Sequence, residues 1–176
     1  MTDTLTPTQR HDCMSRVHSK NTKPEILVRK WLWQHGFRYR LNVKDIPGRP
    51  DIVMRKYKTL IFVNGCFWHG HDGCDKFVMP KSNVEFWQSK ISRNRERDLK
   101  NYKTLQESGW NVIVVWECGL KSSSFEETMA KVISKIGKDP QKPFEYPAPD
   151  SGFAVAAEPE AEYKTTTANA FKKNKN

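Results

Sequence analysis

The chain has 176 residues, and its 30 Lys and Arg against 20 Asp and Glu give a formal net charge of +10. This length allows one globular domain with a proper core. The sequence has no apolar leader of a secretory signal and no apolar run near the roughly 20 residues of a membrane span, so we expect an intracellular protein. Residues 1–121 hold 22 basic and 12 acidic residues, and this local excess is typical of a partner such as nucleic acid.

Residues 1–21 are polar and basic, and we interpret them as an N-terminal arm. Thr6-Pro7 is typical of a helix start, and the short helix that we expect there carries Met14 on one side. A second helix is predicted from Thr22, because Glu25 three residues later completes a capping box. The capping box alone gives Glu25 a structural explanation. The apolar residues of this helix that follow at helical spacing are Ile26, Leu27, Trp31 and Leu32.

Three short strands are predicted before residue 64. Residues 37–41 alternate apolar and basic side chains, as in a half-buried strand. A Pro-Gly turn then delivers Asp51 at the head of a strand over residues 51–54, and the apolar residues 59–63 return as a buried strand. A hairpin of this kind would bring Asp51 and His69 towards one site.

The segment Gly65–Cys74 concentrates two cysteines, two histidines and two adjacent aromatic residues in ten positions. Together with Cys118, which follows an apolar strand, it supplies enough ligands for a closed tetrahedral zinc site, and such sites are usually structural. Spacing leaves open whether His69 or His71 is the fourth ligand beside Cys66, Cys74 and Cys118, with His71 favoured. The histidine left over is the candidate for chemistry.

The second half of the chain predicts a long helix, a strand and a last helix. The helix over residues 83–107 is predicted to have one apolar face, with Lys and Arg residues on the rest of its surface. This basic surface is either simply solvated or binds a polyanion. Its expected apolar face holds Phe86, Trp87, Ile91, Leu99, Tyr102 and Leu105. A strongly apolar strand follows over residues 110–116, and a short amphipathic helix over residues 122–138. Residues 139–176, rich in Pro, Ala and Glu, have the composition of a disordered tail.

These elements predict an α/β domain over residues 22–138, with a mixed sheet flanked by helices. Several motifs in this order and spacing resemble those of the bacterial very-short-patch repair endonucleases, over roughly residues 5–121. They are Pro47-Gly48-Arg49-Pro50-Asp51, Gly65-Cys66-Phe67-Trp68-His69, Phe86-Trp87, Glu96-Arg97-Asp98, Gly109-Trp110 and Val115-Trp116-Glu117-Cys118. Asn64 departs from the pattern, since some members carry a histidine there.

The resemblance implies a restriction-endonuclease-like core with separate catalytic and structural metals. Asp51 and the backbone carbonyl of Val63 would bind magnesium, His69 would be the general base, and Glu25 would join the water shell of the metal. The structural zinc ligands implied by the family are Cys66, His71, Cys74 and Cys118.

The resemblance also implies the substrate, which is double-stranded DNA with a T:G mismatch left by deamination of 5-methylcytosine. One strand would be nicked 5′ to the thymine, with Phe67, Trp68 and Trp87 wedged between base pairs and Met14 over the other groove. A monomer in the bacterial cytoplasm, associated with the nucleoid, is expected. It would be linked in function to a cytosine-5 methyltransferase and to mismatch-repair proteins.

Two other readings stay open at the level of the sequence. One is a zinc-stabilised module that binds nucleic acid without catalysis, and a carboxylate at Asp51 argues against it because it would repel phosphate. The other is a restriction-type nuclease of the same fold, which would not need the aromatic pair Phe67-Trp68 to detect a weakened base step.

Overall fold

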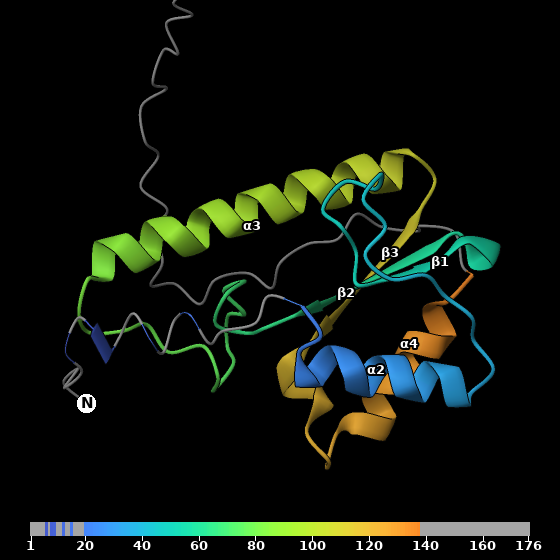
Figure 1. Ribbon diagram of the computed structural model, residues 1–176, viewed down its shortest axis with the longest axis horizontal. Coiled ribbons are helices and arrows are strands. Elements are labelled where there is room, and N and C mark those ends of the chain that lie inside the picture. Colours follow the sequence, from blue (N-terminus) through green and yellow to red (C-terminus); the bar gives the residue numbers. More distant parts are fainter. Residues whose placement is uncertain (1–5, 7, 10–11, 13–14, 16–19, 138–176) are drawn as a thin grey trace, which may run out of the picture.

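The computed structural model describes residues 20–137 without a break, together with Thr6, Thr8, Gln9, Asp12 and Ser15 (Figure 1). Met14 and the segment 139–176 lie outside the described residues. The division into an arm, a domain and a tail therefore stays a prediction.

The described part of the chain folds as a three-stranded mixed sheet with helices on both faces (Figure 1). Its elements are α2 (Lys23–Gln34), β1 (Ile52–Met54), η1 (Arg55–Tyr57), β2 (Thr59–Asn64), α3 (Val84–Glu107), β3 (Asn111–Trp116), η2 (Glu117–Leu120) and α4 (Phe125–Lys135). The central strand β2 pairs antiparallel with β1 and parallel with β3. The predicted mixed sheet flanked by helices is thus confirmed.

The predicted strand over residues 37–41 is wrong in extent, because only Arg40 pairs with the sheet. Arg40 and Val53 exchange two backbone hydrogen bonds of 2.9 Å, which form an isolated bridge. On one side the next partner in the ladder would be Arg55, which already belongs to the 3-10 helix η1. On the other side Asn42 has a φ of 50°, in the left-handed region, and turns the chain away. A longer ladder therefore cannot form.

The sheet separates two apolar cores, because alternate side chains of a strand point to opposite faces. Ile61 packs with Val28 and Met129 in the core on one side, beneath α2 and α4. Leu60 belongs to the second core, which includes Tyr102 of α3. Figure 1 shows α3 on one side of the sheet and α2 and α4 on the other.

The buried face of α2 differs from the expected one. Ile26 and Leu27 are 38% and 46% exposed, whereas Glu25, Val28, Arg29 and Leu32 are buried. The capping box explains the difference, since it turns Glu25 inward and the buried stripe follows at 28, 29 and 32. Sequence periodicity assigns hydrophobic residues to the buried face of a helix. In α2 the ion pair of Glu25 and Arg29 occupies part of that face instead.

The other helices also depart from the expected pattern in places. In α3, Ile91, Tyr102 and Leu105 are buried as expected, but Phe86 and Leu99 are 56% and 40% exposed. The last helix, α4, begins at Phe125 rather than at residue 122, because residues 121–124 form a turn. Of the helices that the structure describes, none combines the length and apolar character that a bilayer-spanning segment requires.

Met129→Ala should destabilise the domain by about 3 kcal/mol, because this fully buried side chain fills the core between α4 and the sheet. Urea unfolding, followed by circular dichroism, measures the change. Leu99→Ala is the matched control on an exposed helix position and should cost less than about 1 kcal/mol. Equal losses for the two variants would contradict this description of the core.

Candidate active site and metal centre

The segment Gly65–Cys74 leaves the end of β2 and packs against α3 on one side. The side-chain amide of Asn94 donates to the carbonyl of Trp68 (2.9 Å), and Arg95 pairs with Asp72 (2.9 Å). At Gly70, with a φ of 59°, an added Cβ would lie 2.8 Å from the Cγ2 of Ile91. This close approach requires glycine, so the loop is fitted to the helix.

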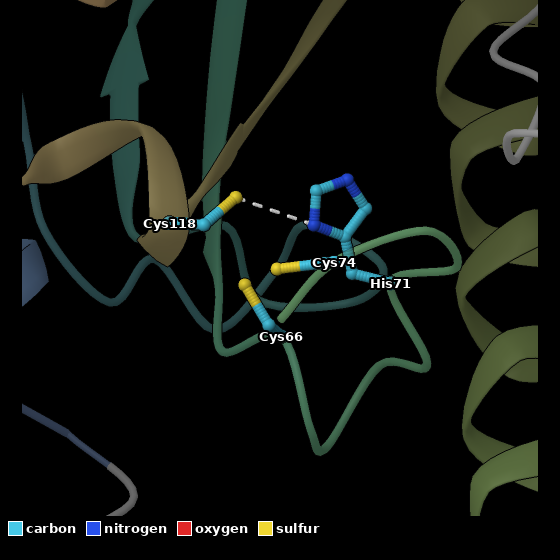
Figure 2. A group of neighbouring side chains, drawn as sticks. All are labelled: Cys66, His71, Cys74 and Cys118. Carbon is cyan, nitrogen blue, oxygen red and sulfur yellow. Dashed lines mark hydrogen bonds between the residues drawn. The ribbon is translucent and has the colours of Figure 1, made fainter. Parts of the chain in front are cut away.

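On its other side the loop is joined to the end of β3 by a cluster of Cys66, His71, Cys74 and Cys118 (Figure 2). One potential ligand atom from each residue lies within 4.8 Å of all the others. The sulfur of Cys118, which belongs to η2, is 3.4 Å from Nδ1 of His71. The His71 ring also stacks on Trp116, with ring centroids 4.1 Å apart. The four side chains converge as a tetrahedral metal site would require.

The surroundings of this cluster control its protonation. Burial raises the pKa of the Cys66 thiol to about 12 and also raises the pKa of Cys118. Burial lowers the pKa of His71 and so favours the neutral imidazole that binds metals. The raised pKa values of Cys66 and Cys118 favour the protonated thiols unless a cation displaces their protons, so metal binding there would release protons. Three sulfur atoms and an imidazole make a donor set that could hold a metal ion.

Asp51 lies where the β1–β2 ladder ends. The last β1–β2 pair is Ile52 with Ile61. Beyond it, the N–H of Val63 on β2 donates a hydrogen bond to Oδ2 of Asp51 (2.8 Å) instead of to a backbone oxygen of β1. The N–H and C=O of a strand residue point to the same side, so the Val63 carbonyl also faces the Asp51 side. The structure therefore brings a carboxylate and a backbone oxygen to one sheet edge, as the proposed magnesium site needs.

The Asp51 carboxyl has a strongly perturbed acidity. Its pKa is raised from 3.8 to about 6, mainly by burial and in smaller part by the nearby charge of Glu25. The Val63 N–H and the charges of Arg29 and His69 act in the opposite direction. Asp51 and His69 are thus close enough to interact electrostatically, from different segments of the chain.

His69 is held by Asp98, a residue for which no role was predicted from the sequence. The Asp98 carboxylate accepts a hydrogen bond from Nδ1 of His69 (2.5 Å), which leaves Nε2 as the basic nitrogen of the ring. Asp98 is 6% exposed and also pairs with Arg97. The signal was present in the sequence: Asp98 lies on the helical stripe of Ile91, Tyr102 and Leu105, where a carboxylate is out of place unless it has a partner.

Glu25 is engaged by donors on both carboxylate oxygens. The N–H of Asn21 (3.0 Å) and the guanidinium of Arg29 (2.6 Å) bond to Oε2. The N–H and hydroxyl of Thr22 (3.4 and 2.9 Å) bond to Oε1. The predicted capping box is confirmed, and Glu25 lies near enough to Asp51 to influence its charge.

Three aromatic rings gather beside the loop. The ring of Phe67 lies 5.3 Å from both Trp68 and Trp87, and the two indoles are 6.1 Å apart. All three side chains are half-buried, and the exposed ring of Phe86 extends the group. The rings meet edge to face, which is a favourable packing geometry for aromatic side chains. A partly open aromatic surface therefore adjoins the segment that carries His69.

Asp51→Asn should raise the melting temperature, measured without divalent cations, by about 3 °C above pH 6. The pKa of Asp51 is higher in the folded state than in the unfolded state. Above pH 6 the charged carboxylate is therefore desolvated only in the folded state, which costs folding free energy. Below pH 3.8 the carboxyl is protonated in both states, and the gain should vanish as the pH falls towards that value. Calorimetry between pH 4.5 and 8 measures it, with exposed Asp45→Asn as control. A gain that grows on acidification would refute the assignment.

Comparison with known proteins gives a consistent family. Residues 2–76 match the family described as DNA mismatch endonuclease Vsr. The chain is 51% identical over 137 residues to the type II nicking enzyme V.NmeAIP of Neisseria meningitidis, covering 77% of this chain and 97% of that protein. It is 49% identical over 120 residues to V.XorIIP of Xanthomonas oryzae, covering 68% and 88%. It is 39% identical over 121 residues to DNA mismatch endonuclease Vsr of Escherichia coli, covering 69% and 77%. The chain therefore belongs to the Vsr family of DNA endonucleases.

Proposed function

We propose that this endonuclease nicks one strand of duplex DNA on the 5′ side of the thymine in a T:G mispair, and so starts the repair of deaminated 5-methylcytosine. The membership in the Vsr family supports the nuclease reaction. The observation that carries the proposal is one of arrangement. A single loop bears His69, which lies close enough to Asp51 to interact with it electrostatically, together with Phe67 and Trp68, and the rings of both aromatic residues pack beside Trp87 of α3.

Asp51 and the Val63 carbonyl would hold a magnesium ion. Both are hard oxygen donors, which magnesium prefers. The raised pKa of Asp51 indicates that its negative charge is poorly solvated, and a bound cation would stabilise that charge. Bound there, magnesium supplies positive charge that offsets the negative charge developing on the phosphate during hydrolysis. Glu25 would take part through water in the same site.

His69 would act as the general base. Its Nε2 is free to accept a proton from the attacking water, while Nδ1 stays bonded to Asp98. The Asp98 carboxylate both orients the ring and stabilises the imidazolium that forms. The hydrogen bond of Asn94 to the Trp68 carbonyl holds the residue before His69, and so limits movement of the ring away from the phosphate.

The aromatic group would detect the mismatch. Insertion of a side chain between base pairs costs unstacking energy, and a mispaired step costs less to unstack than a matched one. Phe67, Trp68 and Trp87 would supply the wedge, with Met14 on the other groove. Because Phe67 and Trp68 share one loop with His69, insertion at the mismatch would also place the His69 ring near the bond to be cut.

The four-residue cluster would bind zinc as a structural ion. Thiolates and imidazole suit zinc, and a site with four protein ligands has no open position for a substrate. The two metals would thus divide their tasks by ligand type, with soft donors for the scaffold and oxygen donors for catalysis.

The proposed reaction also implies the setting of the protein. A T:G mispair from 5-methylcytosine arises only where a cytosine-5 methyltransferase acts, so the two activities belong together. We propose a monomer that works on DNA in the bacterial cytoplasm, at the nucleoid, in concert with mismatch-repair proteins.

A labelled duplex with one T:G mispair should be nicked in the presence of magnesium, while the matched T:A duplex stays intact. Denaturing gel electrophoresis gives the position and rate of the break. Asp51→Ala should lower the nicking rate by about 100-fold or more while mismatch binding, measured by gel shift, survives. Equal cleavage of both duplexes would refute the mismatch specificity, and unchanged nicking by Asp51→Ala would remove Asp51 from the mechanism.

His69→Ala and His71→Ala should separate the two metal centres. His69→Ala should keep one zinc per chain and lose nicking, because His69 lies outside the Cys/His cluster. His71→Ala should release its zinc to a chelator far more readily than the wild type, because one of four ligands is gone. Zinc is measured by atomic emission on purified protein. Loss of zinc in His69→Ala alone would reverse the assignment.

A further inference from the structure

The turn that precedes Asp51 is held firmly against α3. The N–H of Arg49 donates to the carbonyl of Ile46 (3.1 Å), which closes the turn. At Gly48, with a φ of 72°, an added Cβ would lie 3.1 Å from the side-chain nitrogen of Asn101 on α3. Ile46 is buried in the second core, on the same side of the sheet. The turn therefore has a fixed place in the body of the protein.

Arg49 has a backbone conformation that an arginine rarely adopts. Its φ is 50°, in the left-handed region, where the Cβ of any residue other than glycine is crowded. Pro50 follows, and the residue before a proline favours extended backbone with a negative φ. Among the described residues, Arg49 and Lys58 alone combine a positive φ with a side chain other than Gly or Asn. Such strain gathers at functional sites, where a particular side chain is needed despite its cost.

The guanidinium of Arg49 is open to a ligand. The residue is exposed, and its side chain forms no ion pair with any carboxylate of the described part of the chain. Three arginines close to the site differ in this respect, since Arg29, Arg95 and Arg97 each pair with an acid. An unpaired arginine on a fixed turn presents a positive charge and several N–H donors to an anion from outside.

The position of Arg49 in the chain places it near the proposed reaction centre. It lies two residues before Asp51, so the two Cα atoms are at most about 7 Å apart. Each DNA strand carries a phosphate for about every 3.4 Å of helix axis, so the guanidinium lies within a few phosphates of the bond that Asp51 would help to cut. The Asp51 carboxylate repels phosphate, whereas a guanidinium binds it with two parallel N–H bonds.

We propose that Arg49 binds a phosphate of the DNA backbone beside the phosphate that is cut, and so sets the position of the strand against Asp51. The inference rests on the proposed function, in which Asp51 lies at the reaction centre. A phosphate contact fixes register and does not read base sequence, so Arg49 contributes equally on mismatched and matched duplexes. Because the turn is already fixed, little ordering of the chain is needed when DNA binds.

A purely structural role predicts something different. If the left-handed φ of Arg49 only turned the chain into β1, glycine would serve better there, and DNA binding would not depend on the side chain. Lys58 is the matched comparison, because it is also an exposed cation in the left-handed region, with a φ of 44°. It lies at the opposite end of β1 from Asp51, beyond η1. Replacing either residue by glycine removes one positive charge.

The test compares Arg49→Gly with Lys58→Gly in the full chain. Binding to a labelled duplex is followed by fluorescence anisotropy without divalent cations, so that no strand is cut, from about 50 to about 300 mM KCl. Arg49→Gly should lower the slope of log K against log salt by about one and weaken binding about tenfold, on T:G and matched T:A duplexes alike. Lys58→Gly should keep the slope and change the affinity less than about twofold.

Thermal unfolding of the same proteins checks the strain. Both glycine variants should melt about 3 °C above the wild type, because glycine relieves the left-handed backbone. Arg49→Gly would then be more stable and yet bind DNA less tightly, a combination that a purely structural role does not produce. A lower melting temperature for Arg49→Gly would contradict the strain on which the proposal stands.

Two further variants separate the charge of Arg49 from its backbone. Arg49→Lys keeps the charge and should keep the slope, whereas Arg49→Asn, whose side chain tolerates the left-handed region, should lose it as glycine does. An unchanged slope in Arg49→Gly, or an equal loss in Lys58→Gly, would overturn the proposal. Because binding is measured without cleavage and on both duplexes, a protein that does not prefer T:G DNA can still show the predicted change in slope.

Discussion

The segment Gly65–Cys74 is held from two sides, and the candidate site depends on this constraint. Side chains of α3 hold it through Asn94, Arg95 and Asp98. The Cys/His cluster joins it to η2 at the end of β3. A loop of this length with three glycines would otherwise sample many conformations. Fixed in this way, it presents a histidine and an aromatic surface in a defined relation to the sheet edge.

Three acidic residues of the site each pair with a basic side chain. Glu25 has Arg29, Asp98 has His69, and Asp72 has Arg95. Asp51 differs, because its hydrogen bond to the Val63 N–H offsets only part of the desolvation that raises its pKa. The one carboxylate left under-compensated is thus the one that the proposed reaction assigns to a metal, which agrees with the tendency of perturbed acids to mark functional sites.

Local patterns in the sequence predicted the elements well and the buried polar contacts poorly. The capping box at Thr22, the apolar runs of β2 and β3 and the glycine after α3 depend on neighbours in the chain, so they could be predicted. The bond between His69 and Asp98 joins residues 29 apart and depends on how α3 packs, which no short-range pattern encodes. The failed strand at residues 37–41 has the same origin, since its alternation was right but Asn42 ends the pairing.

The four residues of the Cys/His cluster are far apart in the order of synthesis, and this limits when the cluster can assemble. Three of its members lie within nine residues, but Cys118 comes 44 residues after Cys74 and reaches the others only when β3 has paired in register with β2. A nascent chain that has not yet emerged as far as η2 has no means of completing the cluster. The loop that carries His69 can therefore be held on its second side, through Cys118, only once β3 has joined the sheet.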